Sequence, residues 1–140
     1  MGRVFFNTRE NLDTTSLTGT DTYVMLASDS GKTFLVSGGT QTVTLLPAAD
    51  MIEGWRCRFV TTASPSGDKT IGAGSAVIHG THVATPTESD NGAGTDGTAV
   101  SNIIIEAASQ AGNWMEIVCD GSAYYFFAAA SQDAAFSTSW

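Results

Sequence analysis

The sequence predicts an all-β domain, an antiparallel β-sandwich or β-barrel of the jelly-roll type, with an extended N-terminal arm. Apolar residues recur at every second position in short runs, and Gly, Pro and Asp separate those runs. Trp55, Cys57 and Phe59 alternate with Arg56 and Arg58, so we expect the first three side chains to be buried. The alternation of helices and strands that builds a parallel sheet is missing from the sequence.

Three segments follow from the composition. Residues 1–21 are polar and Thr-rich beyond Val4, Phe5 and Phe6, and are predicted to form an arm. Residues 22–128 carry the period-two runs and are predicted to form one β-domain, for which 140 residues are sufficient. Residues 129–140 form a small, polar tail.

Seven to nine short strands are expected in the domain. Pro47 ends one of them because it has no N–H to donate, and Ala48–Glu53 can form one helical turn. Gly80–Thr98 is predicted to be a long loop. The predicted strands are Thr22–Ala27, Lys32–Val36, Thr42–Leu46, Trp55–Thr62, Ser75–His79, Asn102–Ala108, Trp114–Cys119 and Ala123–Ala128.

Charge and hydropathy exclude several kinds of partner. Fourteen acidic residues against six scattered basic ones give a net charge of −8, which argues against nucleic acid. No apolar run approaches the roughly 18 residues of a membrane helix, and no secretory signal opens the sequence. We therefore expect synthesis in a cytoplasm and no membrane partner. Charged residues make up only 14% of the chain, and a charge-poor surface suits contact with other proteins.

Cys57 and Cys119 lie in the middle of predicted strands, far apart in the sequence. Buried free thiols are the first interpretation. A disulfide between them stays open as the alternative, since both side chains could point into one core.

Several motifs resemble binding sites only in part. Gly31-Lys32-Thr33 lacks the first glycine of a phosphate-binding loop and continues as a strand, so we interpret it as a turn. His79 and His82 are too few for zinc and are interpreted as surface residues of a loop. The run Glu88–Gly97 has oxygen ligands but not the spacing of a calcium loop; whether residues 80–98 bind calcium or a glycan stays open.

No catalytic residue, metal ligand or cofactor is predicted, and we expect the protein not to be an enzyme. Carboxylates are available, but nothing in the sequence marks two of them as a catalytic pair. Trp55 and Trp114 could be platforms for sugars, although each opens a strand after Gly and is expected to fill the core. The carboxylates concerned are Asp50, Glu53, Glu106, Glu116 and Asp120.

Four segments together resemble the small β-domains of tailed-phage virions, which occur in head-decoration proteins and at the tips of tail fibres and spikes. They are DSGKTFLV at 29–36, TVTLLP at 42–47, GWRCRF at 54–59 and GNWMEIV at 112–118. The resemblance covers roughly residues 22–62 and 100–128. It implies trimeric β-modules that bind other virion proteins or host glycans, without catalytic residues.

The absence of a fibre shaft favours a capsid decoration protein within this group. We expect a homotrimer on the capsid surface of the virion, with the major capsid protein and itself as partners. Val4, Phe5 and Phe6 are the expected anchors of the arm, and Phe136 and Trp140, beyond the last predicted strand, are expected to contact a neighbouring subunit or the capsid. The alternative is a receptor- or glycan-binding tip module, which exposed aromatic residues beside the 80–98 loop would favour.

Overall fold

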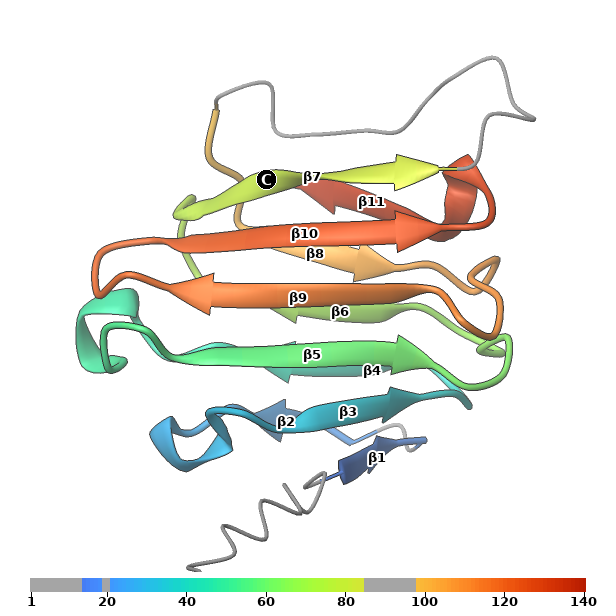
Figure 1. Ribbon diagram of the computed structural model, residues 1–140, viewed down its shortest axis with the longest axis horizontal. Helices are drawn as coiled ribbons and strands as arrows, with labels where there is room; N and C mark the ends of the chain where they lie inside the picture. Colours follow the sequence, from blue (N-terminus) through green and yellow to red (C-terminus); the bar gives the residue numbers. More distant parts are fainter. Residues whose placement is uncertain (1–13, 19–20, 85–97) are drawn as a thin grey trace, which may run out of the picture.

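The computed structural model describes residues 14–18, 21–84 and 98–140, which form two β-sheets packed face to face (Figure 1). The six-stranded sheet has the order β1 (Thr14–Leu17), β3 (Thr33–Val36), β5 (Arg56–Thr61), β9 (Trp114–Cys119), β10 (Tyr124–Ala130) and β7 (Ile78–Ala84). The five-stranded sheet has the order β11 (Phe136–Ser139), β8 (Asn102–Ile105), β6 (Lys69–Gly72), β4 (Gln41–Thr44) and β2 (Tyr23–Val24). The helical elements of these residues are the short 3-10 turns η1 (Ala27–Asp29), η2 (Ala48–Asp50) and η3 (Asp133–Ala135).

The predicted all-β sandwich is confirmed, but its strand pairing is mixed. From β1 to β6 the chain crosses to the other sheet after every strand, so strands that follow each other in one sheet run parallel. Antiparallel pairs join β5 to β9, β9 to β10, β6 to β8 and β8 to β11. Period-two alternation reports which face of a strand is buried and carries no information on the direction of its neighbour. Parallel pairing was therefore not visible in the sequence.

The sandwich extends beyond residues 22–128 at both ends. β1 lies in the segment predicted as an arm, and its Leu17 is buried in the core. β11 lies in the predicted tail, where Phe136 stands opposite Ile105 of β8. The expectation that Phe136 lies beyond the last strand is wrong: one apolar residue followed by Ser-Thr-Ser shows no period, yet the strand is held by backbone pairing.

Two further elements differ from the prediction. β6 was missed because Ile71 is its one large apolar residue. β7 extends to Ala84 and occupies the start of the segment predicted as a long loop. The other strands agree to within a few residues, and the helical turn expected within Ala48–Glu53 is η2.

Aromatic side chains fill the core between the sheets. Phe34 stacks on Phe59 with 5.2 Å between ring centroids, and Trp55 meets Tyr124 edge-on at 6.3 Å. The polar ends of these rings are satisfied, because Trp55 Nε1 donates to the Leu26 carbonyl at 3.1 Å and Tyr124 Oη to the Leu46 carbonyl at 2.7 Å. The predicted burial of Trp55 and Phe59 is confirmed.

Cys57 and Cys119 are both buried and free in this core. Burial raises the pKa of both thiols, that of Cys57 well above its ordinary value. Raised pKa values keep the thiols protonated, and protonated thiols are poor nucleophiles and metal ligands.

Asp29 is a buried acid that holds the turn before β3. Its carboxylate accepts hydrogen bonds from the Leu26 backbone N–H at 2.9 Å and from Tyr23 Oη at 3.2 Å, and it pairs with Lys32 Nζ at 2.8 Å. Burial alone would raise the pKa of Asp29, but the hydrogen bonds from Lys32 and Leu26 outweigh it, and the pKa is lowered. The predicted turn at Gly31-Lys32-Thr33 thus follows η1 and enters a strand.

Candidate interaction surface on the six-stranded sheet

A row of apolar side chains runs across five of the six strands on the outer face of the six-stranded sheet. Strand register places Leu35 of β3 opposite Val60 of β5, Val60 opposite Trp114 of β9, Trp114 opposite Ala129 of β10, and Ala129 opposite Val83 of β7. Their chain neighbours point into the core, so these five side chains point outward. Trp114 is 38% exposed and Val83 61% exposed. We call these five residues the apolar row.

More apolar side chains flank the row on β9 and β10. Phe127 is 63% exposed and Tyr125 39% exposed, and both alternate with buried residues of β10. Tyr125 stands opposite Val118 of β9 and stacks on His79 of β7 with 5.8 Å between ring centroids. The apolar row together with Val118, Tyr125 and Phe127 forms what we call the aromatic face.

Charged groups on this face are few and partly neutralise each other. Arg58 donates to Glu116 at 2.9 Å on the next strand, and its guanidinium lies 5.4 Å from the centroid of the Trp114 ring. Such an exposed ion pair and cation–π contact are each worth about 1 kcal/mol or less. Together they place the Arg58 side chain between Glu116 and the Trp114 ring.

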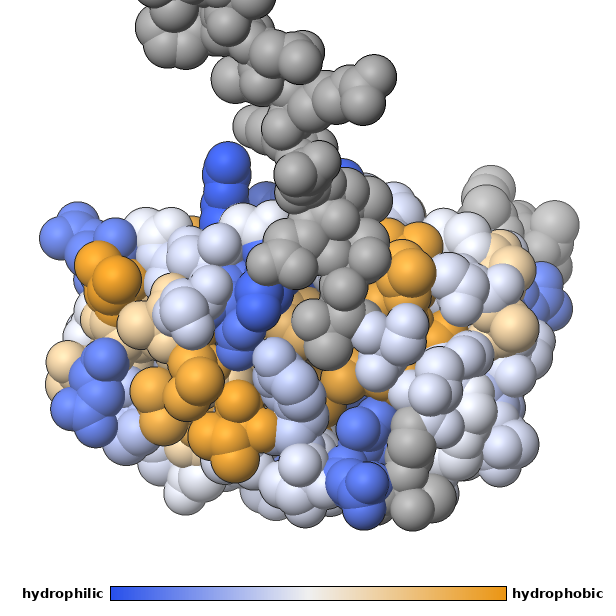
Figure 2. Space-filling view, turned by 90° about the horizontal axis from the view of Figure 1, so that it is seen from below, coloured by the Kyte–Doolittle hydropathy of each residue, from blue (hydrophilic) through white to orange (hydrophobic). Residues whose placement is uncertain are grey.

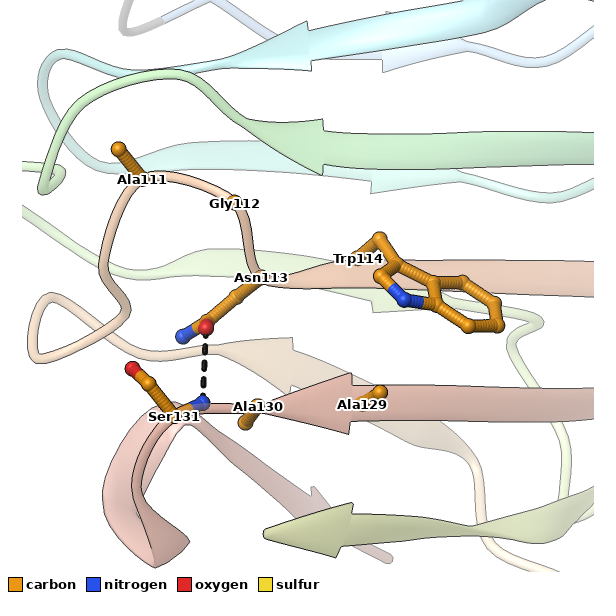
Figure 3. Close-up of a pocket in the computed structure, with 7 residues that line it drawn as sticks. All are labelled: Ala111, Gly112, Asn113, Trp114, Ala129, Ala130 and Ser131. Carbon is orange, nitrogen blue, oxygen red and sulfur yellow. Dashed lines mark hydrogen bonds between the residues drawn. The ribbon is translucent and has the colours of Figure 1, made fainter. Parts of the chain in front are cut away.

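A shallow depression of about 330 Å³ lies beside Trp114, at the end of the sandwich where β9 begins and β10 ends (Figure 3). Buried Asn113 ties its two sides together, since its Oδ1 accepts from the Ser131 backbone N–H at 2.9 Å and its Nδ2 donates to Ser109 Oγ at 3.2 Å. The depression is therefore bordered by fixed backbone. Its lining consists of Ala111, Gly112, Asn113, Trp114, Ala129, Ala130 and Ser131.

The outer face of the five-stranded sheet has a different character. Most of its outward side chains are short and polar, with Val24 and Ile104 as the large apolar exceptions. The same chain thus presents a hydroxyl-rich face on one sheet and an aromatic face on the other. The polar members are Thr42, Thr44, Thr70, Asn102, Ser137 and Ser139.

Exposed apolar residues outside the aromatic face are scattered. Figure 2 looks at the β1–β2 end of the sandwich, where hydrophobic side chains form separate groups among hydrophilic ones. Val24 and Leu26, in and just after β2, are 47% and 51% exposed. Ile52 follows η2, and Trp140 closes the chain. Single exposed apolar residues of this kind are normal on protein surfaces.

The predicted contact residues are placed unequally. Val4, Phe5 and Phe6 lie outside the described residues. Trp140 is 75% exposed, whereas Phe136 is 3% exposed and belongs to the core of its own chain. Phe136 can contact no neighbour unless β11 leaves the sheet, so we withdraw it as an interface residue.

The two histidines are strand residues rather than residues of a loop. His79 points outward against Tyr125, while His82 is buried with its ring 5.8 Å from that of Phe136. Because the two side chains point to opposite faces of one strand, they cannot bind the same metal ion. In the part of the chain that the structure describes, no three His, Cys, Asp or Glu residues lie close enough together to hold a metal. Glu88–Gly97 lies entirely outside the described residues.

The exposure of Trp114 could have been predicted from the sequence. Trp114 was expected in the core, but in Trp114–Cys119 the apolar Met115, Ile117 and Cys119 share one face. Trp114 therefore has to share the other face with Glu116. The joining of residues from five strands into one row depends on strand order, which the sequence does not reveal.

Fold and surface together define a β-sandwich with one apolar outer face. Comparisons with protein families, with curated proteins and with solved structures find no match to the chain. None of the helical segments in the described residues has the length and hydropathy needed to cross a membrane.

Proposed function

We propose that the protein is a structural virion protein of a tailed phage, a decoration protein that binds the capsid as a homotrimer. The observation that carries the proposal is the contrast between the two outer faces: hydroxyl-rich on the five-stranded sheet, aromatic on the six-stranded one. If both sheets served only to enclose the core, the outer face of each would be expected to be polar and solvated. The resemblance of the sequence to virion β-domains is the reason for proposing a homotrimer attached to other virion proteins.

Attachment to a lattice suits a small module of this type. A contact burying roughly 1,200–2,000 Å² is enough for specific binding, and three linked copies multiply the avidity of weak individual contacts. The arm anchors Val4, Phe5 and Phe6 and the exposed Trp140 are the proposed contacts with the major capsid protein.

The test is attachment to capsids purified without the protein. Wild-type protein should cosediment with such capsids and saturate at a fixed number of copies per capsid subunit, and Trp140→Ala should weaken the binding. A matched control is Ile52→Ala, which removes another exposed apolar side chain, 63% exposed, at a different place. Absence of saturable binding by the wild-type protein would refute the proposed function.

A receptor- or glycan-binding tip module is the second candidate, and one observation favours it. Trp114 and Tyr125 are exposed, and Tyr125 stacks on His79 of β7, the strand that includes the first residues of the 80–98 segment. Sugar rings stack on such aromatic side chains. The aliphatic neighbours Val60 and Val83 offer no hydrogen bonds, however, and glycans require polar partners for their hydroxyl groups. Titration with an oligosaccharide array separates the two candidates: saturable sugar binding lost in Trp114→Ala would replace the first proposal.

A further inference from the structure

We propose that the aromatic face is the surface through which three copies of this chain pack around a threefold axis. This inference deepens the proposed function and rests on its homotrimer, and it assigns the subunit contact to the six-stranded sheet. The occupant of the face is thus a second and a third copy of the same chain.

The position of the largest side chain in the apolar row fits a threefold arrangement. Three equal sheets around an axis enclose a triangular prism, which is deepest at the middle of each sheet and shallow where neighbouring sheets meet. The one aromatic residue of the row, Trp114, lies on β9, the middle strand of the five. The aliphatic residues Val60 and Ala129 stand on either side of it, and Leu35 and Val83 stand at the ends.

The dimensions of the sheet agree with the reach of these side chains. Five strands at about 4.8 Å spacing give a face about 24 Å wide, and a prism of that width has its axis about 7 Å from each sheet. Sheets that pack flat lie about 10 Å apart, so an average layer of side chains fills about 5 Å. The larger depth at the centre of a prism therefore calls for an aromatic residue in the middle of the row.

The area of the face is adequate for a stable contact. A face about 24 Å wide and about 20 Å long covers roughly 500 Å², and protruding aromatic side chains bring its accessible area towards the about 800 Å² that each partner contributes to a standard interface. Aromatic residues and Arg are the types enriched in such contacts, and Trp114, Tyr125, Phe127 and Arg58 belong to them.

The charges on the face are compatible with contact between identical copies. Arg58 and Glu116 bring both signs to each copy and already neutralise each other within the chain. Burial in an interface therefore leaves Arg58 and Glu116 paired with each other, while Arg56, exposed on the same face opposite Val118, has to stay solvated at the rim of the contact.

The experiment is sedimentation equilibrium of the full chain with substitutions on each outer face. Wild-type protein should sediment at about three times 14.5 kDa. Trp114→Glu and Phe127→Glu place a charge in the contact and should each raise the trimer dissociation constant by at least about thirtyfold. The matched control is Thr42→Glu, which places the same charge on the exposed part of the other face and should leave the trimer intact.

Each outcome decides between the alternatives. Circular dichroism and thermal unfolding show whether the variants are folded. If Trp114→Glu does not fold, Val83→Glu, at a position that is 61% exposed, replaces it in the test. A wild-type monomer or dimer, or trimers that persist in folded Phe127→Glu and Val83→Glu, would overturn the inference. Capsid binding is measured separately on the wild-type protein. A wild-type trimer that these substitutions dissociate, but that does not itself bind capsids, keeps the inference and refutes the proposed function. Capsid binding by the dissociated variants keeps the decoration role and removes its dependence on the trimer.

Discussion

Replacing Phe136 by Ala tests the finding that the C-terminal strand completes the core. The Phe136 side chain is 3% exposed and belongs to the core cluster, with its ring 5.8 Å from that of His82. Truncating a buried Phe to Ala costs about 3–5 kcal/mol, from the lost transfer free energy and from the cavity left behind. This is a large share of the about 5–15 kcal/mol that stabilises a typical domain.

Thermal unfolding followed by circular dichroism measures the effect. At about 2.1 cal/mol/K per residue, a 140-residue domain has an unfolding entropy of roughly 0.3 kcal/mol/K, so Phe136→Ala should lower Tm by about 10–17 °C. The control is Trp140→Ala, four residues later in the sequence and 75% exposed, which should change the free energy of unfolding by less than about 0.5 kcal/mol. Both are measured at low protein concentration to exclude effects of association. A Tm change below about 3 °C for Phe136→Ala would refute the assignment of β11 to the core.

Two further predictions concern the first half of the chain. Deleting residues 2–12 should leave the free energy of unfolding nearly unchanged and weaken capsid binding. Deleting residues 2–20 also removes β1 with buried Leu17, and should lower the free energy of unfolding by about 2–5 kcal/mol or more. Equal denaturant midpoints for the two deletions would contradict this. Asp29→Asn should cost about 1–3 kcal/mol at neutral pH, because it removes the ion pair with Lys32. Since the folded-state pKa of Asp29 is lowered, its contribution is present above the ordinary carboxyl pKa of 3.8 and is lost as pH falls through the folded-state pKa, so the difference in stability between wild type and variant should shrink in acid. A difference that is constant from neutral to strongly acidic pH would show that the lowered pKa is wrong.

The sequence predicted the features that depend on local pattern. The strand predicted at Trp55–Thr62 is β5, Arg56–Thr61, one residue shorter at each end, and Trp55, Cys57 and Phe59 are buried as predicted. A half-buried strand alternates apolar and polar residues, and this pattern is visible in the sequence. Trp114–Cys119 was predicted with its observed boundaries.

Features that depend on distant contacts were not predicted. β6 and β11 each contain a single large apolar residue, Ile71 and Phe136, and are held in place by pairing with β8. Trp114 was assigned to the core because it opens a predicted strand, although its alternation with Met115 places it outside. The apolar row exists because the order β3-β5-β9-β10-β7 aligns residues from distant parts of the chain, and that order is a property of the fold as a whole.

Electron microscopy of the particle that carries this protein tests the central claim most directly. Our account predicts three copies around a threefold axis on the capsid surface, with their six-stranded sheets turned towards the axis and Trp114 of each copy buried against the other two. Single copies, or copies at the tip of a fibre with the aromatic face directed to solvent, would contradict it.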